Sequence, residues 1–198
     1  MYLIGLTGGI GSGKTFISKI ICSNYQFKLF DSDLIAKNIL NFNKKTINIV
    51  KKKFGTESYI DNRLNTKYIS NIVFSDLEKL KTLNEIVHPE VSKEFEKFKI
   101  KNSKNIIVIE SALLFETGVY LKNNINILVV TPMNLRIDRI INRDKISKKD
   151  TIKIINSQWK DSKKIDLADF VIENINRLET EKIVKKLMND ILLKYEKN

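Results

Sequence analysis

Eight residues near the N-terminus restrict the fold of this chain more than any other segment. Residues 8–15 read GGIGSGKT and match G-x-x-x-x-G-K-[ST] at every fixed position. An apolar segment, residues 2–6, precedes them, and a helical pattern over about residues 14–23 follows. The glycines let backbone N–H groups turn inward onto phosphate oxygens, and the helix dipole favours the same anion. A chance Gly-rich turn is the alternative, but the strand–loop–helix context favours a site for a nucleoside triphosphate. In such a site, Lys14 would contact the β- and γ-phosphates and the Thr15 hydroxyl would bind Mg²⁺.

Short apolar runs recur along the chain and alternate with helical patterns. They occupy residues 2–6, 27–30, 106–109, 125–130 and 170–172. Continuous apolar runs of this length are typical of strands buried on both faces. The alternation predicts an α/β fold with a doubly wound parallel sheet of about five strands. An amphipathic helix over residues 178–195 is expected to pack on the core.

One interval, residues 34–104, interrupts this alternation. It contains no convincing strand and has helix-period segments at residues 67–74, 77–87 and 90–101. It is too long for a connecting loop, so we expect a helical subdomain over the nucleotide site. The sole histidine, His88, precedes Pro89. Proline disfavours helix at the preceding residue and is suited to open a helix, so a helix junction is expected there.

Composition places the chain among ordinary globular proteins. At 198 residues, with 42% hydrophobic and 29% charged residues, it can form one substantial core. No apolar run approaches the roughly 20 residues needed to span a membrane, and residues 2–6 are interpreted as a core strand rather than a signal peptide. A lone Cys22 excludes intramolecular disulfides and fits a reducing compartment, so a cytoplasmic location is expected.

The net charge of +12 raises the possibility of a nucleic-acid partner. Most lysines are interspersed with acidic residues, and no aromatic-studded basic stripe occurs. A chain-wide excess of lysine is weak evidence for nucleic acid, and an AT-rich genome would also produce it. We therefore expect a small polyanionic substrate and no nucleic-acid or membrane partner, in a monomer or weak homo-oligomer.

Three carboxylates follow predicted strands. Asp31 and Asp33 come at the end of the second strand, and Glu110 ends the strand at residues 106–109. Ligands of open α/β sheets bind at the carboxyl ends of strands, so these side chains are expected to face the phosphate loop. Of Asp31 and Asp33, one is suited to the outer shell of Mg²⁺ and the other to accept a proton from an attacking hydroxyl, and Glu110 is suited to support Mg²⁺. A helix N-cap is the alternative for this Asp pair, and both readings can hold.

Arg136, Arg139 and Arg143 recur at i, i+3 and i+7 on one predicted helix. Three guanidiniums on one helical face suit a lid that closes on a transferring phosphoryl group. The alternative is a solvated stripe paired with Asp138 or Asp144.

These residues, taken together, resemble the dephospho-CoA kinase family through almost the whole chain. The shared features are the loop from Gly5 to Lys14, Asp31-Ser32-Asp33, Phe54-Gly55, Val73-Phe74, Leu83-Asn84, His88-Pro89, Leu113-Leu114-Phe115-Glu116, Arg139, Arg143-Asp144, Gln158, Ala168-Asp169 and Asn174. The glycine-rich loop with this Asp-x-Asp and this His-Pro is far more specific than the phosphate-loop motif alone.

The resemblance implies a nucleotide core, a helical substrate subdomain and a lid over about residues 134–166. It implies transfer of the ATP γ-phosphate to the ribose 3′-hydroxyl of dephospho-CoA. Asp33 would be the base, with Lys14 and Arg139 stabilising the transferred phosphoryl, and His88 and Arg143 would serve the acceptor with Asp33. The implied ATP-binding residues are Gly9, Gly11, Ser12, Gly13, Lys14, Thr15, Phe16, Arg139 and Asn174.

The chain departs from the family pattern at several positions. Glu110 stands where Asp is usual, Ala112 where Pro is usual, and Arg136 where Gln is common; Phe16 replaces a small Ser or Thr. The Gly and Arg usual ahead of Val73 are replaced by Asn62 and Thr66, with Arg63 and Lys67 nearby.

Three other functions compete with this interpretation. A different P-loop kinase, acting on a nucleoside or nucleotide, would share the core and lid, so the helical interval decides between them. A GTP-binding switch would need N-K-x-D, but residues 43–46 end in Thr and residues 147–150 begin with Ser. A nucleic-acid-dependent ATPase would show strongly salt-dependent binding.

Overall fold

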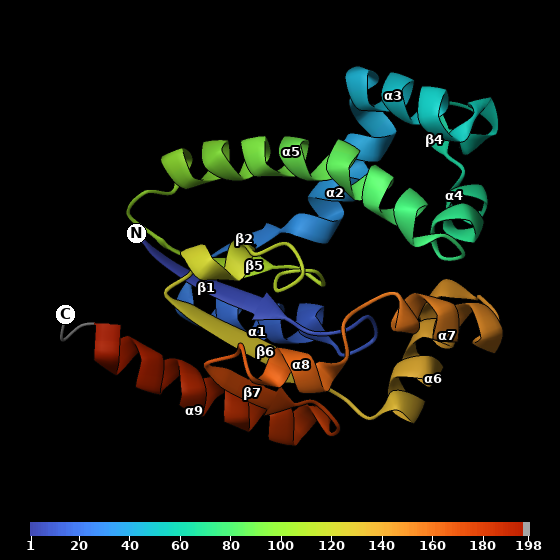
Figure 1. The fold of residues 1–198 in the computed structure, drawn as a ribbon. Helices are drawn as coiled ribbons and strands as arrows, with labels where there is room; N and C mark the ends of the chain where they lie inside the picture. The colour runs from blue at the N-terminus through green and yellow to red at the C-terminus, as the bar shows by residue number, and fades with distance from the viewer. Residues whose placement is uncertain (196–198) are drawn as a thin grey trace. The chain divides into compact units, whose positions relative to one another are not determined.

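The computed structural model describes residues 1–195, and these form two compact units (Figure 1). One unit comprises Met1–Phe30 and the described chain from Asn102 onward; the other is Asp31–Lys101. None of the helices described is long and apolar enough to cross a membrane.

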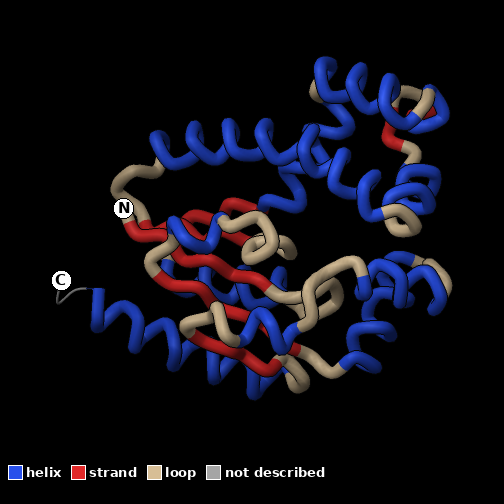
Figure 2. Tube along the Cα trace, viewed as in Figure 1, coloured by secondary structure: helices blue, strands red, loops and turns tan. Residues whose placement is uncertain are grey.

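The first unit is built on a five-stranded sheet in the order β2-β5-β1-β6-β7. Its strands are labelled in Figure 1 and drawn in red in Figure 2. β1 pairs in parallel with β5 and β6, and β6 pairs in parallel with β7. This confirms the predicted doubly wound α/β fold. The strands are β1 (Tyr2–Thr7), β2 (Lys28–Asp31), β5 (Ile106–Glu110), β6 (Ile125–Val130) and β7 (Phe170–Glu173).

Helices supply the rest of the first unit's core. They are α1 (Lys14–Tyr25), α6 (Met133–Asp144), α7 (Lys148–Asn156), α8 (Asp161–Ile165) and α9 (Arg177–Tyr195), with a 3₁₀ turn η2 (Val119–Lys122). Ile17 and Ile21 of α1 and Val184 and Met188 of α9 are buried in one apolar cluster with β1, β5 and β6. The expected packing of the C-terminal helix on the core is thus confirmed.

The second unit is mainly helical. It contains α2 (Ser32–Phe42), α3 (Lys44–Phe54), the 3₁₀ turn η1 (Thr56–Ser58), β3 (Tyr59–Ile60), β4 (Arg63–Leu64), α4 (Thr66–Val73) and α5 (Leu77–Lys101). Its own apolar cluster buries Val50, Phe54, Ile69 and Val87.

The expectation that this interval has no strand is wrong, because β3 and β4 form a short antiparallel hairpin. Asp61 and Asn62 connect them with φ angles of 47° and 60°. Positive φ at both central residues is the geometry of a type I′ turn, which Asp and Asn tolerate. Strands of two residues are too short to give an alternating pattern.

The expected helix junction at His88 and Pro89 is also wrong. α5 runs without a break from Leu77 to Lys101, with Pro89 inside it. Proline removes one helical N–H and costs about 3 kcal/mol in a helix interior. Burial of Leu83 and Val87 in the second unit's core, with Val91 packed against it, offsets that cost.

Candidate nucleotide site

The predicted phosphate loop joins β1 to α1 in the first unit. Gly13 is the N-cap of α1 with φ 92°, a left-handed conformation that glycine adopts without strain. Ser12 and Lys14 are buried, and the Lys14 ammonium donates to the Gly8 carbonyl at 2.9 Å. The buried Ser12 hydroxyl has no hydrogen-bond partner among the residues described. A loop that leads into a helix N-terminus and holds a buried ammonium and an unpaired hydroxyl has the chemistry of an anion site.

Glu110 lies beside the first turn of α1. Its carboxylate is 3% exposed and accepts from the Thr15 hydroxyl and from the Ser18 hydroxyl, each at 2.6 Å. The Thr15 proton therefore points to Glu110, which leaves the oxygen's lone pairs for a cation. Residues 1–195 contain no group of three or more His, Cys, Asp or Glu side chains that could hold a metal alone.

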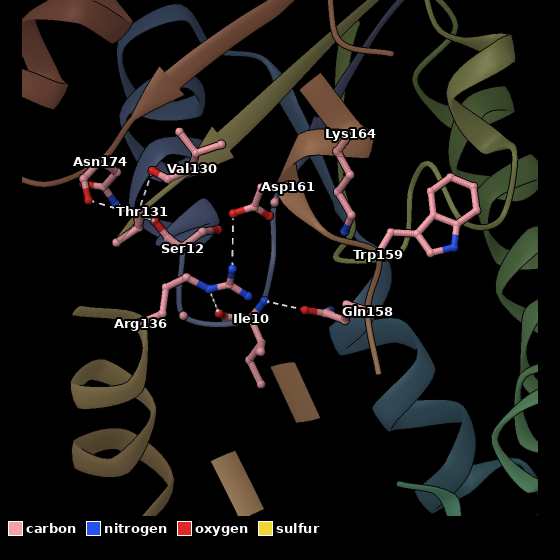
Figure 3. A network of polar contacts seen from close by, with 12 residues as sticks. Ile10, Ser12, Val130, Thr131, Arg136, Gln158, Trp159, Asp161, Lys164 and Asn174 are labelled. Atoms are coloured by element: carbon pink, nitrogen blue, oxygen red, sulfur yellow. Dashed lines mark hydrogen bonds and ion pairs between the residues drawn. The ribbon is translucent and has the colours of Figure 1, made fainter. Parts of the chain in front are cut away.

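The C-terminal side of the loop is tied to the ends of β6 and β7. The Ser12 carbonyl accepts from the Asn174 amide at 2.8 Å and from the Thr131 hydroxyl at 3.0 Å (Figure 3). Thr131 directly follows β6, and Asn174 directly follows β7. Asn174, which the resemblance implies as an ATP-binding residue, therefore contacts the phosphate loop, and Thr131 is an anchor that the sequence analysis missed.

Arg139 lies against the same carbonyl groups. One guanidinium nitrogen is 3.4 Å from the carbonyl oxygens of Gly11 and Ser12, and the other donates to the Asn174 carbonyl at 3.1 Å. Partial burial lowers the pKa of Arg139, and the neighbouring charge of Arg177 lowers it further. Arg177 also lies over the Phe16 ring, 5.6 Å from its centroid.

The three arginines of α6 do not act alike. Arg136 is buried, donates from Nε to the Ile10 carbonyl at 2.9 Å, and pairs with Asp161 at 3.2 Å. Arg143 is exposed and forms a two-pronged ion pair with Asp144 at 2.7 Å. This pairing raises the pKa of Arg143. Arg136 and Arg139 donate to carbonyl groups of the phosphate loop, whereas Arg143 pairs with Asp144 as the solvated alternative describes. The role of Arg143 toward an acceptor stays a prediction.

A further buried ion pair adjoins the loop's anchors. Lys164, fully buried, pairs with Glu116 at 2.7 Å, and Glu116 also accepts from the Trp159 backbone N–H at 3.1 Å. Gln158, next to Trp159, accepts from the Ile10 N–H at 2.8 Å. Because lysine is rarely fully buried unless paired, the adjacent Lys163 and Lys164 suggest exposed side chains. The sequence therefore contains no sign that Lys164 forms a buried ion pair.

Asp31, Asp33 and His88 belong to the second unit. Asp31 ends β2 and caps α2, accepting from the Leu34 N–H at 2.9 Å. The capping alternative therefore holds for Asp31, whereas Asp33 lies in the first turn of α2. His88 is partly buried within α5, and this burial lowers its pKa. The roles of these residues toward an acceptor stay predictions.

Comparison with known proteins gives one consistent result. A family model described as dephospho-CoA kinase matches residues 2–180. A dephospho-CoA kinase of Fusobacterium nucleatum is 38% identical over 178 residues, which cover 89% of this chain and 91% of that protein.

Solved structures agree with this result. A dephospho-CoA kinase from Campylobacter jejuni aligns with a TM-score of 0.67 and 28% identity, covering 96% of each chain. A Thermus thermophilus protein aligns with a TM-score of 0.80 and 26% identity, covering 98% of this chain and 97% of that one.

Proposed function

The chain belongs to the dephospho-CoA kinase family, and from this premise we propose that it phosphorylates the ribose 3′-hydroxyl of dephospho-CoA. ATP is the phosphate donor, and coenzyme A and ADP are the products. The observation that carries the proposal is the family match over residues 2–180, which includes an intact phosphate loop.

Lys14 and Arg139 are assigned to the phosphoryl group in transfer. Lys14 starts α1 and is buried beside the loop, where water does not screen its charge. Arg139 reaches the loop from α6 with its guanidinium against the Gly11 and Ser12 carbonyls. Two fixed cations stabilise the negative charge that the transferred group distributes over its oxygens.

Thr15 and Glu110 are the residues that would hold Mg²⁺. Hydroxyl and carboxylate oxygens suit this cation, which usually keeps several waters and needs few protein ligands. When bound, Mg²⁺ neutralises charge on the β- and γ-phosphates. Asp31 remains a third candidate, although its carboxylate is engaged in capping α2.

Asp33 is the proposed base that takes the proton of the acceptor hydroxyl. Its neighbour Asp31 caps α2, and we assign different tasks to the two carboxylates. We further propose that the helical unit, with His88, recognises the acceptor and that residues 134–166 form the lid. Basic side chains of that unit would pair with the acceptor's pyrophosphate.

An acceptor panel tests the proposal and its nearest alternative. Dephospho-CoA, adenosine, AMP, thymidylate and shikimate are each supplied at equal concentration with ATP and Mg²⁺, and ADP release is followed. We expect kcat/KM for dephospho-CoA to exceed that of every other acceptor. Preference for a nucleoside or nucleotide would replace the specific function while leaving a P-loop kinase.

ATP hydrolysis measured with added nucleic acid at several salt concentrations tests the nucleic-acid alternative. Binding that depends on phosphate neutralisation along a nucleic acid weakens steeply as salt rises. We expect no stimulation of ATP hydrolysis by single- or double-stranded nucleic acid at any salt concentration.

A further inference from the structure

Ile10, in the middle of the phosphate loop, is held through both of its backbone polar groups. Its N–H donates to the Gln158 side-chain oxygen at 2.8 Å, and its carbonyl accepts from Arg136 Nε at 2.9 Å (Figure 3). Arg136 lies on α6, and Gln158 lies between α7 and α8. Two segments remote in sequence therefore fix a single residue of the loop.

Ile10 and Gly11 form the centre of a tight turn. The Ser12 N–H donates to the Gly9 carbonyl at 3.1 Å, and Gly11 has φ 80°. Positive φ at the third residue is the geometry of a type II turn. In such a turn, rotation of the central peptide unit reverses the directions of its carbonyl and its N–H.

The central peptide unit here joins the Ile10 carbonyl to the Gly11 N–H. A trans peptide is planar, so its carbonyl and N–H point in opposite directions. The hydrogen bond from Arg136 to the Ile10 carbonyl therefore also sets the direction of the Gly11 N–H. Backbone N–H groups are what a phosphate loop presents to its ligand.

Asp161 keeps Arg136 in this position. Arg136 is 6% exposed, and its Nη1 lies 3.2 Å from the Asp161 carboxylate. Burial lowers the pKa of Arg136, and Asp161 opposes this shift. A β-carbon at Gly9 would overlap the same guanidinium, so the side chain is packed directly on the loop.

We propose that Arg136, held by Asp161, is a positioning residue that fixes the Ile10–Gly11 peptide and thereby sets the loop's affinity for ATP. Its charge is paired with Asp161 and its Nε is bonded to the backbone, so it acts through the loop. Arg139, in contrast, is assigned to the transferred phosphoryl group. The inference rests on the proposed function only in taking ATP as the ligand.

The test measures binding of a non-hydrolysable ATP analogue with Mg²⁺ by calorimetry, in the full-length protein without acceptor. Arg136→Ala should raise the dissociation constant about 10- to 100-fold, the range for losing a hydrogen bond from a charged group. Arg136→Gln, which retains an N–H donor, should recover part of the loss. Lys186→Ala, which removes an exposed charge on α9, is the control and should bind as wild type.

Steady-state kinetics separate positioning from direct catalysis. Arg136→Ala should raise KM for ATP and leave KM for dephospho-CoA unchanged. A fall in kcat with unchanged ATP affinity would overturn the proposal, because the guanidinium would then act on the reacting phosphate. Failure to phosphorylate dephospho-CoA would refute the proposed function and leave the binding test intact.

A double-mutant cycle tests the role of Asp161. Asp161→Asn should weaken analogue binding less than Arg136→Ala, and the double variant should bind no worse than Arg136→Ala alone. If the losses in analogue binding free energy of the two single variants added up in the double variant, Asp161 would not act through Arg136. If Arg136→Ala fails to fold by circular dichroism, Arg136→Gln and Asp161→Asn carry the test, and wild-type affinity in both would overturn the proposal.

Discussion

The phosphate loop and the helical unit are held in opposite ways. The loop is fixed by directional hydrogen bonds from side chains far away in sequence, such as Gln158 and Asn174. The helical unit is held by an apolar cluster around Val50, Phe54 and Val87, and most of its side-chain hydrogen bonds are local ones at helix caps or within helices. Directional bonds place backbone atoms, whereas apolar burial supplies stability without direction. Substitutions in the first region should therefore change ligand binding and chemistry, and those in the second should change stability.

The largest expected effect breaks this division, because it lies in the helical unit. Asp33→Asn should lower kcat by about 10²- to 10⁴-fold, the usual contribution of a general base. KM for dephospho-CoA should change little, since the lost interaction belongs to the transition state. The measurement is steady-state kinetics with both substrates varied.

Asp31→Asn is the matched variant for this prediction. Asparagine is also a good N-cap, so α2 should remain capped and kcat should fall far less. A crippled Asp31→Asn beside a nearly silent Asp33→Asn would reverse the two assignments.

Lys14→Ala should lower kcat by about 10²- to 10³-fold, as the loss of a transition-state electrostatic group typically does. The variant should still fold, as circular dichroism would show, because the anchors at Ile10 and Ser12 remain although the hydrogen bond from the Lys14 ammonium to the Gly8 carbonyl is lost. Turnover within about threefold of wild type would remove Lys14 from the chemistry.

Phe54→Ala tests the helical unit. Phe54 is 6% exposed in the second apolar cluster, so its truncation should lower the free energy of unfolding by about 3–5 kcal/mol. Urea unfolding measures the loss, and affinity for the ATP analogue should be unchanged in the folded variant. Ile100→Ala, at a position 77% exposed, is the control and should change stability by less than about 0.5 kcal/mol.

His88 should give the smallest effect, a pH dependence of stability. Burial lowers its pKa, so the folded state disfavours the protonated imidazole. As pH falls below about 6.5, the unfolded chain binds a proton first and the free energy of unfolding decreases. Above about pH 6.5, the full contribution of His88 to the free energy of unfolding is present.

The difference in the free energy of unfolding between wild type and His88→Gln, measured against pH, separates the effect of His88 from the titration of carboxylates. Urea unfolding from about pH 7.5 to about pH 5.5 should show a steeper loss in wild type. Equal slopes in the two proteins would mean that His88 has no part in the pH dependence.

Sequence patterns predicted the features that depend on local periodicity. The five strands, the loop and the C-terminal helix are in this class, because continuous apolar runs and the phosphate-loop motif report on the chain nearby. Burial on both faces was expected for all five strands, but the edge strands β2 and β7 bury only one residue each. The β3–β4 hairpin escaped because strands of two residues have no period. α5 continues through Pro89 because its apolar side chains are buried in the folded unit. Local helix propensity takes no account of such tertiary contacts.

The loop's anchors were harder to predict than the loop itself. Spacing on one helix grouped Arg136, Arg139 and Arg143. The partners of Arg136 and Arg139 come from other segments, whereas Arg143 pairs with Asp144 next to it. Arg136 is buried, where it pairs with Asp161 and donates a hydrogen bond to the Ile10 carbonyl. Arg143 is exposed and pairs with Asp144. The charge stripe therefore placed the three guanidiniums on one helix, which the structure has, without distinguishing the contacts of each.

The most direct test of the account is the destination of the γ-phosphate. The full-length protein is incubated with Mg²⁺, dephospho-CoA and ATP labelled in its γ-phosphate, and the product is digested with a phosphatase specific for ribose 3′-phosphates. We expect labelled coenzyme A that loses all of its label and returns to dephospho-CoA. Label that resists this digestion, or that appears only in inorganic phosphate, would contradict it.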